Sequence, residues 1–182
     1  MVMTKPNIKV GYDEDGQQWL CEELFENDFG TFVAWHRRRN LGKVNAPDHD
    51  SFLQTVPKDA LRIPIFIYEH GGFVLSTTPF SCPWDSGQVG VWVFTPQDLV
   101  SIYGEDSEES RKKAREGVEA QIKYMNDVFC GNVWYFEIED FDGETADSCG
   151  MFVGIEEALE AMKEHVPENL HRSLEKAWDK RW

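Results

Sequence analysis

The residues best suited to chemistry lie in a turn-rich segment near the middle of the chain, residues 78–90 (TPFSCPWDSGQVG). Cys82 and Asp85 lie within this segment, and His70 precedes it. A thiol, an imidazole and a carboxylate are the groups of a cysteine nucleophile, its general base and the residue that orients the base. One interpretation is therefore a thiol-dependent hydrolase or transferase that uses Cys82, His70 and Asp85.

A second interpretation gives the same segment a purely structural role. Cys82 is then a small buried apolar side chain, Trp84 fills the core and Asp85 accepts hydrogen bonds within the loop. Prolines restrict φ, and glycines permit a left-handed or closely packed backbone. The residues of this structural motif are Cys82, Pro83, Trp84, Asp85, Gly87 and Gln88.

The apolar runs that flank the segment are expected to position it. Residues 61–68, 73–77 and 89–94 are rich in the β-branched and aromatic residues that favour strands. The glycine pair in residues 69–72 (EHGG) predicts a hairpin turn between the first two strands. The segment is therefore expected to be a loop held between core strands.

The remaining elements complete an α+β fold. Strands are expected at residues 8–12 and 30–36, and a hairpin at 132–140 and 144–153 that turns at Asp142-Gly143. Helices are expected at 95–104, between Thr95 and Gly104 as caps, and at 107–129 with Asp106 as the cap. The overall expectation is a largely antiparallel sheet of about six or seven strands, flanked by the long helix and by a C-terminal helical pair in residues 153–182. A length of 182 residues suits a single domain, residues 1–182.

Acidic residues are concentrated in the second half of the chain, which has a formal net charge of −15. Residues 105–160 hold 16 acidic side chains against five basic ones. Glu137 and Glu139 fall on one face of a strand, where like charges repel unless a cation or a basic partner answers them. The candidate partner-binding cluster comprises Glu137, Glu139, Asp140, Asp142, Glu144 and Asp147. A bound divalent cation and a solvated face that maintains solubility are the alternatives.

The composition also disfavours several classes of protein. The negative charge argues against binding to nucleic acids or anionic membranes, and the one dense basic run, Arg37-Arg38-Arg39, is expected to pair with carboxylates. No apolar run approaches the roughly 20 residues of a membrane helix. The four cysteines and five histidines form no zinc pattern, so no metal or other cofactor is expected. We expect an intracellular protein that does not bind membranes.

Residues 76–90 (STTPFSCPWDSGQVG), preceded by a strand that ends in Tyr68-Glu69-His70, resemble a family of small acidic proteins carried by phages and mobile elements of gut bacteria. The resemblance extends from Gly30 to Gly150, and the chain is similar to anti-CRISPR proteins that act on type II-A systems. It implies no catalytic residue.

The resemblance implies an inhibitor that binds a type II CRISPR effector nuclease with its guide RNA and blocks DNA cleavage by stoichiometric binding in the bacterial host cytoplasm. Such a protein is not an enzyme and makes no direct contact with nucleic acid. A thiol-dependent enzyme and a divalent-metal-binding phage accessory protein are the two alternative functions.

Overall fold

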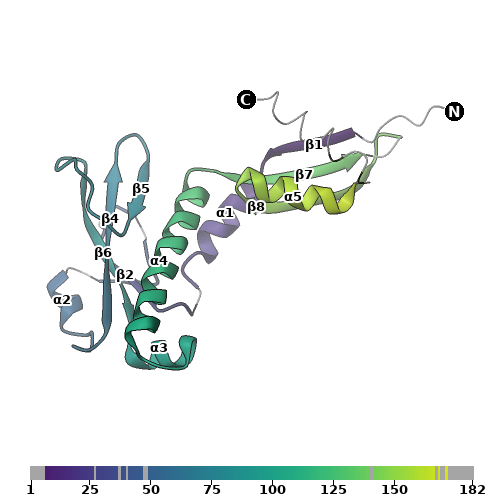
Figure 1. Ribbon diagram of the computed structural model, residues 1–182. Helices are drawn as coiled ribbons and strands as arrows, with labels where there is room; N and C mark the ends of the chain where they lie inside the picture. Colours follow the sequence, from purple (N-terminus) through teal and green to yellow (C-terminus); the bar gives the residue numbers. More distant parts are fainter. Residues whose placement is uncertain are drawn as a thin grey trace. The chain divides into compact units, whose positions relative to one another are not determined.

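The computed structural model describes residues 7–26, 28–36, 38–39, 41–46, 49–139, 142–166, 168 and 171. These residues form five helices and eight strands, and the expected α+β class with largely antiparallel pairing is confirmed (Figure 1). The strands are β1 (Asn7–Tyr12), β2 (Thr31–Ala34), β3 (Val44–Asn45), β4 (Leu61–Glu69), β5 (Phe73–Ser76), β6 (Ser86–Phe94), β7 (Val133–Glu139) and β8 (Thr145–Val153). The helices are α1 (Glu14–Glu23), α2 (His49–Leu53), α3 (Pro96–Tyr103), α4 (Glu108–Phe129) and α5 (Ile155–His165).

The chain divides into two compact units. Unit 1 comprises residues 1–21 and 127–182, and unit 2 comprises residues 22–126. The strands accordingly form two sheets, β1-β7-β8 in unit 1 and β3-β2-β6-β4-β5 in unit 2, instead of the one sheet expected. Periodicity identifies strands but not their partners, which explains this difference. A single domain of residues 1–182 stays a prediction.

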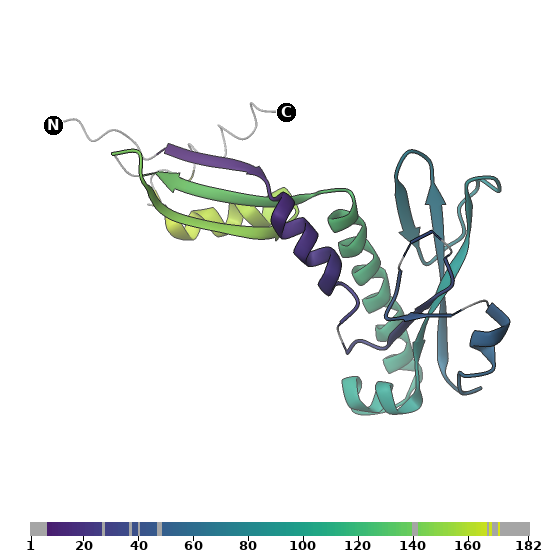
Figure 2. The same ribbon diagram turned by 180° about the vertical axis from the view of Figure 1, so that it is seen from behind.

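Strand β6 lies at the centre of the sheet of unit 2. Its residues from Val89 to Phe94 are buried, because a helix covers each face of the sheet. On one face, Phe52 of α2 packs against Val91 and Val93. Helix α4 lies on the opposite face (Figures 1 and 2). On that opposite side, Trp92 stacks on Phe32 of the neighbouring β2, with ring centroids 5.5 Å apart. Strand β6 is thus buried on both of its faces from Val89 to Phe94.

Gly90 permits the close approach of β2 and β6. A Cβ atom at this position would meet the Phe32 ring and the Val33 carbonyl oxygen. Gly87, the other glycine of the segment, has open space around its Cβ position. Of the two glycines, therefore, Gly90 is the one that close packing requires.

The caps of α3 agree with the sequence prediction, and the cap of α4 does not. Thr95 forms a capping box with Asp98, and Gly104 ends α3 in the left-handed conformation with φ 87°. For α4, Ser107 Oγ accepts from the Ser110 N–H at 3.2 Å, and Ser110 Oγ accepts from the Ser107 N–H at 2.8 Å. The prediction that Asp106 caps α4 is wrong, because the Asp106 carboxylate instead accepts from the guanidinium of Arg111 at 2.6 and 2.7 Å.

A side chain from α4 covers the edge strand of unit 2. Asn126 donates to the Leu75 carbonyl oxygen at 2.9 Å and accepts from the Leu75 N–H at 2.8 Å. Leu75 lies on β5, which is the outermost strand on this side of the sheet. The amide therefore occupies the two backbone groups that another strand would use for pairing.

Unit 1 consists of an antiparallel three-stranded sheet with α5 along one face (Figure 1); Figure 2 shows the strands from behind. Phe136 and Ile138 of β7 pack against Met162 of α5. The predicted hairpin of β7 and β8 is confirmed, with Gly143 at φ 85° in its turn. The first helix of the predicted C-terminal pair is α5, and the second lies outside the described residues.

Asp13 connects three elements of unit 1. Asp13 directly precedes α1, and its Oδ1 atom accepts from the Gly16 N–H at 2.8 Å. The other carboxylate oxygen of Asp13 accepts from the Met151 N–H of β8 at 2.8 Å, and the backbone N–H of Asp13 donates to the Val133 carbonyl oxygen of β7.

Among the described helices, none combines the length and apolarity needed to cross a bilayer.

Candidate functional site

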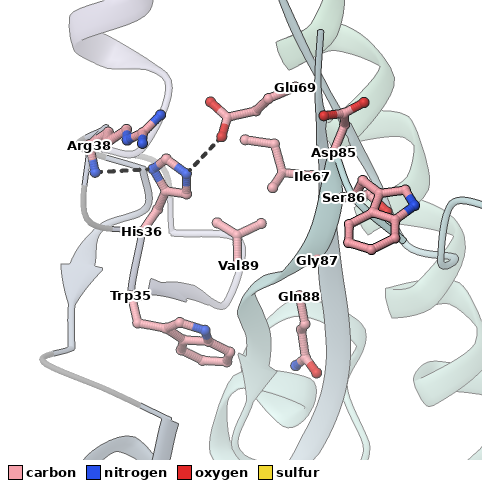
Figure 3. A pocket seen from close by; sticks show the side chains of 11 residues that line it. Trp35, His36, Arg38, Ile67, Glu69, Asp85, Ser86, Gly87, Gln88 and Val89 are labelled. Carbon is pink, nitrogen blue, oxygen red and sulfur yellow. Dashed lines mark hydrogen bonds and ion pairs between the residues drawn. The ribbon is translucent and has the colours of Figure 1, made fainter. Parts of the chain in front are cut away.

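A pocket of about 470 Å³ opens at one edge of the sheet in unit 2 (Figure 3). Because β6 is antiparallel to both β2 and β4, the ends of β2 and β4 meet the start of β6 at this edge. The walls come from Trp35, His36 and Arg38, from the end of β4 and from residues 84–89. The turn-rich segment therefore forms part of a pocket, as well as connecting two strands.

The pairing of β4 with β6 has a β-bulge between Ile65 and Phe66. Before the bulge, Ile65 pairs with Gly90; after it, Ile67 pairs with Gly87. The extra residue is Val89 of β6, and Ile67 and Val89 both line the pocket.

His36, Glu69 and Arg39 form a hydrogen-bonded group at one wall. The Nδ1 atom of His36 accepts from the backbone N–H groups of Arg38 and Arg39 at 3.4 and 3.1 Å, so the ring proton lies on Nε2. His36 Nε2 donates to Glu69 at 3.2 Å (Figure 3), and Arg39 Nε donates to the other Glu69 oxygen at 2.9 Å. Arg39, assisted by His36, holds the pKa of Glu69 below its ordinary value although partial burial opposes this shift. The expectation that the basic run pairs with carboxylates is confirmed for Arg39; Arg37 lies outside the described residues.

The structure brings the three candidate catalytic residues together. Asp85 Oδ2 lies 3.7 Å from Cys82 Sγ and 3.7 Å from His70 Nδ1. His70 lies in the predicted hairpin turn, where Gly71 has φ 75° and the His70 N–H donates to the Gly72 carbonyl oxygen. The loop and the turn are thus adjacent, as a catalytic interpretation requires.

The order of the three groups differs from that of a thiol nucleophile and its base. The thiol donates its hydrogen bond to the carboxylate, so Asp85 lies where the imidazole would have to lie to take the thiol proton. The His70 side chain is 74% exposed, so the site lacks the enclosure that strengthens proton transfer. This arrangement does not activate Cys82.

Trp84 does not fill the core as expected. It is 91% exposed, the most exposed of the large apolar side chains in the described part of the chain, and it borders the pocket. Cys82 is half-buried. The backbone carbonyl oxygen of Asp85 accepts a hydrogen bond from the Glu69 N–H at 2.7 Å. The expectation for Trp84 was wrong because strand β6 already begins at Ser86, which places Trp84 in the loop at the sheet edge.

Much of the acidic cluster in unit 1 has partners within the chain. Glu137 and Glu139 lie on the face of β7 opposite to Phe136 and Ile138, as the alternation predicts. Lys9 of β1 lies directly across from Glu137 and binds Glu139, and this hydrogen bond raises the pKa of Lys9. These two carboxylates were expected to need a nearby positive charge. For Glu139, Lys9 of the same chain supplies it.

The other members of the cluster are distributed around the hairpin. Asp147 Oδ2 lies 2.6 Å from His165 Nδ1 of α5, and Thr145 donates to Glu137. Asp142 and Glu144 also interact within the chain, and Asp140 lies outside the described residues. Within the described residues, no group of three or more His, Cys, Asp or Glu side chains could hold a metal ion. The residues present therefore give the metal alternative no geometric support.

Comparisons of the chain with models of protein families, with curated protein sequences and with solved structures found no match. The candidate site consequently depends on its own geometry. The sequence analysis named Cys82, Asp85 and His70 but missed Trp35, His36 and Glu69, which complete the pocket. Their common signal is that each lies at or just beyond the carboxyl end of a strand, at the edge where the turn-rich segment also ends.

Proposed function

We propose that this protein is a stoichiometric inhibitor of a type II RNA-guided DNA nuclease, that is, an anti-CRISPR protein that binds its target and turns over no substrate. The observation that carries the proposal is the charge of unit 1, whose residues 1–21 and 127–182 hold 17 Asp and Glu side chains against seven Lys and Arg. The resemblance of the turn-rich segment to a family of small acidic phage proteins supports the same conclusion.

Electrostatics explain how such a protein inhibits. The nuclease holds the guide RNA–DNA heteroduplex in a positively charged channel and must rearrange its domains before it cuts. An acidic surface is complementary to the basic residues of such a channel, and it associates quickly because opposite charges steer the encounter. Occupation of the channel blocks DNA binding, and occupation of the surface that rearranges blocks cleavage.

Unit 1 carries further carboxylates on α5, which packs on the face of the sheet opposite to Glu137 and Glu139. Glu156 and Glu157 lie in the first turn of α5, and the exposed Glu164 lies in its last turn, next to His165. Of these, Glu157 accepts from the Val153 N–H at 3.0 Å and helps to join α5 to β8. Glu139 is already paired with Lys9. The carboxylates of α5 therefore contribute to the interaction with the nuclease together with those of the hairpin.

The proposal is tested by measuring the affinity of the protein for a purified type II-A nuclease with its guide RNA, at several salt concentrations. A complex that forms at a fixed stoichiometry and weakens steadily as salt rises is the expected result, because screening acts on exposed charges. Absence of a complex at low salt would refute the proposal.

A thiol-dependent enzyme is the second candidate, and the convergence of Cys82 and His70 on Asp85 Oδ2 is the observation that favours it. An activated Cys82 would be alkylated by iodoacetamide much faster at neutral pH than the exposed Cys130 and Cys149. We expect Cys82 to react no faster than these two. A rate at least about tenfold higher at Cys82, lost in His70→Ala, would favour the enzyme.

A further inference from the structure

Trp84 is exposed in a way that is unusual for the largest apolar side chain. Its side chain is 91% accessible, and it borders a pocket that also has Trp35 as a wall. Tryptophan is enriched among the residues that dominate protein interfaces, because its indole buries a large area and loses little conformational entropy on binding. An exposed indole beside a pocket points to a ligand that covers it.

The backbone around Trp84 is fixed before any ligand binds. Ser86 Oγ donates to the Cys82 carbonyl oxygen across Trp84, and the carbonyl oxygen of Asp85, the next residue, accepts from the Glu69 N–H of β4 at 2.7 Å. The preceding part of the loop is held by Phe80, whose ring packs against Tyr68 at 5.7 Å between centroids. A surface held in this way loses little entropy on binding.

The charges of the pocket specify the ligand. The Asp85 side chain is 42% exposed, and its carboxylate lies 3.7 Å from both His70 Nδ1 and Cys82 Sγ, beyond the distance of a strong charge-assisted hydrogen bond. Glu69, by contrast, already accepts from Arg39 and His36. Asp85 is therefore the carboxylate with capacity for an additional donor.

We propose that this pocket binds the guanidinium group of an arginine presented by a protein partner, with the planar group stacked on the indole of Trp84 and paired with the carboxylate of Asp85. A guanidinium suits both contacts, because it stacks on aromatic faces and its fork of N–H donors matches a carboxylate. Ile67 and Val89 receive the aliphatic part of the side chain.

Arg38 selects for an arginine within a peptide. It lines the pocket on the side of His36, across from Asp85 (Figure 3), and it repels a second cation there. A peptide carbonyl beside the bound arginine is an acceptor for this guanidinium. The inference rests on the proposed function for one point, the basic nuclease that supplies the arginine. The site is defined by the residues of the pocket alone.

The site is tested with blocked tripeptides, Gly-Arg-Gly against Gly-citrulline-Gly, by following the indole N–H signals of Trp84 and Trp35 in NMR titrations. We expect a Kd of about 1 mM for the arginine peptide, as befits a ligand of its size. The neutral citrulline peptide should bind at least about tenfold more weakly. No shift with the arginine peptide, or equal affinity for both peptides, would overturn the inference.

Matched variants separate the site from general charge effects. Trp84→Ala and Asp85→Asn should each weaken binding of the arginine peptide by about tenfold or more, and both side chains are exposed, so the fold is retained. Trp19→Ala, a half-exposed tryptophan of unit 1, and Glu105→Gln, which removes the same charge as Asp85→Asn, should change nothing. Equal loss in the control variants would overturn the assignment.

The titration contains no nuclease, so its outcome is independent of the proposed function. Inhibition of the nuclease without binding of the arginine peptide would refute the pocket and leave the function standing. Peptide binding without any complex between the protein and the nuclease would refute the function and leave the pocket standing.

Discussion

At the scale of single residues, Glu69 connects the pocket to the core. Its carboxylate is 31% exposed and accepts from both Arg39 and His36, while its backbone N–H holds the loop through Asp85. Because Arg39 and His36 hold the pKa of Glu69 below its ordinary value of 4.5, ionised Glu69 stabilises the fold. This contribution is complete above the unfolded pKa and is lost as the pH falls through the lower, folded pKa.

Glu69→Gln should therefore lower the free energy of unfolding by about 1 kcal/mol at pH 7, the scale of a partly exposed ion pair. The difference between the wild type and the variant should shrink as the pH falls below 4.5, where Glu69 of the wild type becomes protonated. Urea denaturation at pH 7 and at several pH values below 4.5 measures both effects. A difference that stays constant over this range would contradict the assigned ion pairs.

Gly90 and Gly87 form a matched pair within the same segment. Gly90→Ala should destabilise the protein by roughly 1–3 kcal/mol, because the new methyl group meets the Phe32 ring and the Val33 carbonyl oxygen. Gly87→Ala should have an effect within about 0.5 kcal/mol, since the space around it is open. Thermal or chemical denaturation of the two variants measures this contrast, and similar effects of both would refute the close approach of β2 and β6.

The residue types of the candidate site could be predicted from the sequence, but their arrangement could not. The catalytic interpretation named Cys82, Asp85 and His70, and Asp85 lies 3.7 Å from each of the other two. The position of Asp85 between the other two depends on the exact start of β6 at Ser86. Trp84 was misplaced for the same reason.

At the scale of elements, Asn126 protects the edge of the sheet in unit 2. Asn126→Ala should destabilise the protein by about 1–2 kcal/mol, because the Leu75 N–H and carbonyl groups lose their partner. The exposed edge should also promote self-association of the variant, which light scattering detects. Lys123→Ala, an exposed position on the same helix, is the control and should do neither.

Most of the elements follow from local patterns. The strands around β6, the hairpin turns at Gly71 and Gly143 and the caps of α3 each have a signal within a few residues, and each is present. The division into two sheets and the bulge at Ile65 have no such signal, because they depend on pairing between distant segments. The cap of α4 was misjudged because Asp106 has a competing partner, Arg111.

At the scale of the whole molecule, charge is the property on which the proposed function depends. Neutralising four acidic residues of the hairpin together, Glu137→Gln, Glu139→Gln, Asp140→Asn and Asp142→Asn, should weaken association with the nuclease by about tenfold and reduce its salt dependence. The control neutralises four acidic residues of unit 2: Glu105→Gln, Glu108→Gln, Glu109→Gln and Glu119→Gln. Affinity measured at low and high salt should fall much less for the control, and equal losses would rule out the hairpin as the binding surface.

The most direct test of the proposed function is a DNA-cleavage assay with a purified type II-A nuclease and guide RNA, titrated with wild-type protein and with Cys82→Ala. Both proteins should inhibit cleavage equally, with inhibition complete near a fixed ratio of protein to nuclease, because occupancy and not turnover blocks the enzyme. No inhibition, or inhibition at ratios far below stoichiometric that is lost in Cys82→Ala, would contradict the proposal and assign the chemistry to the thiol.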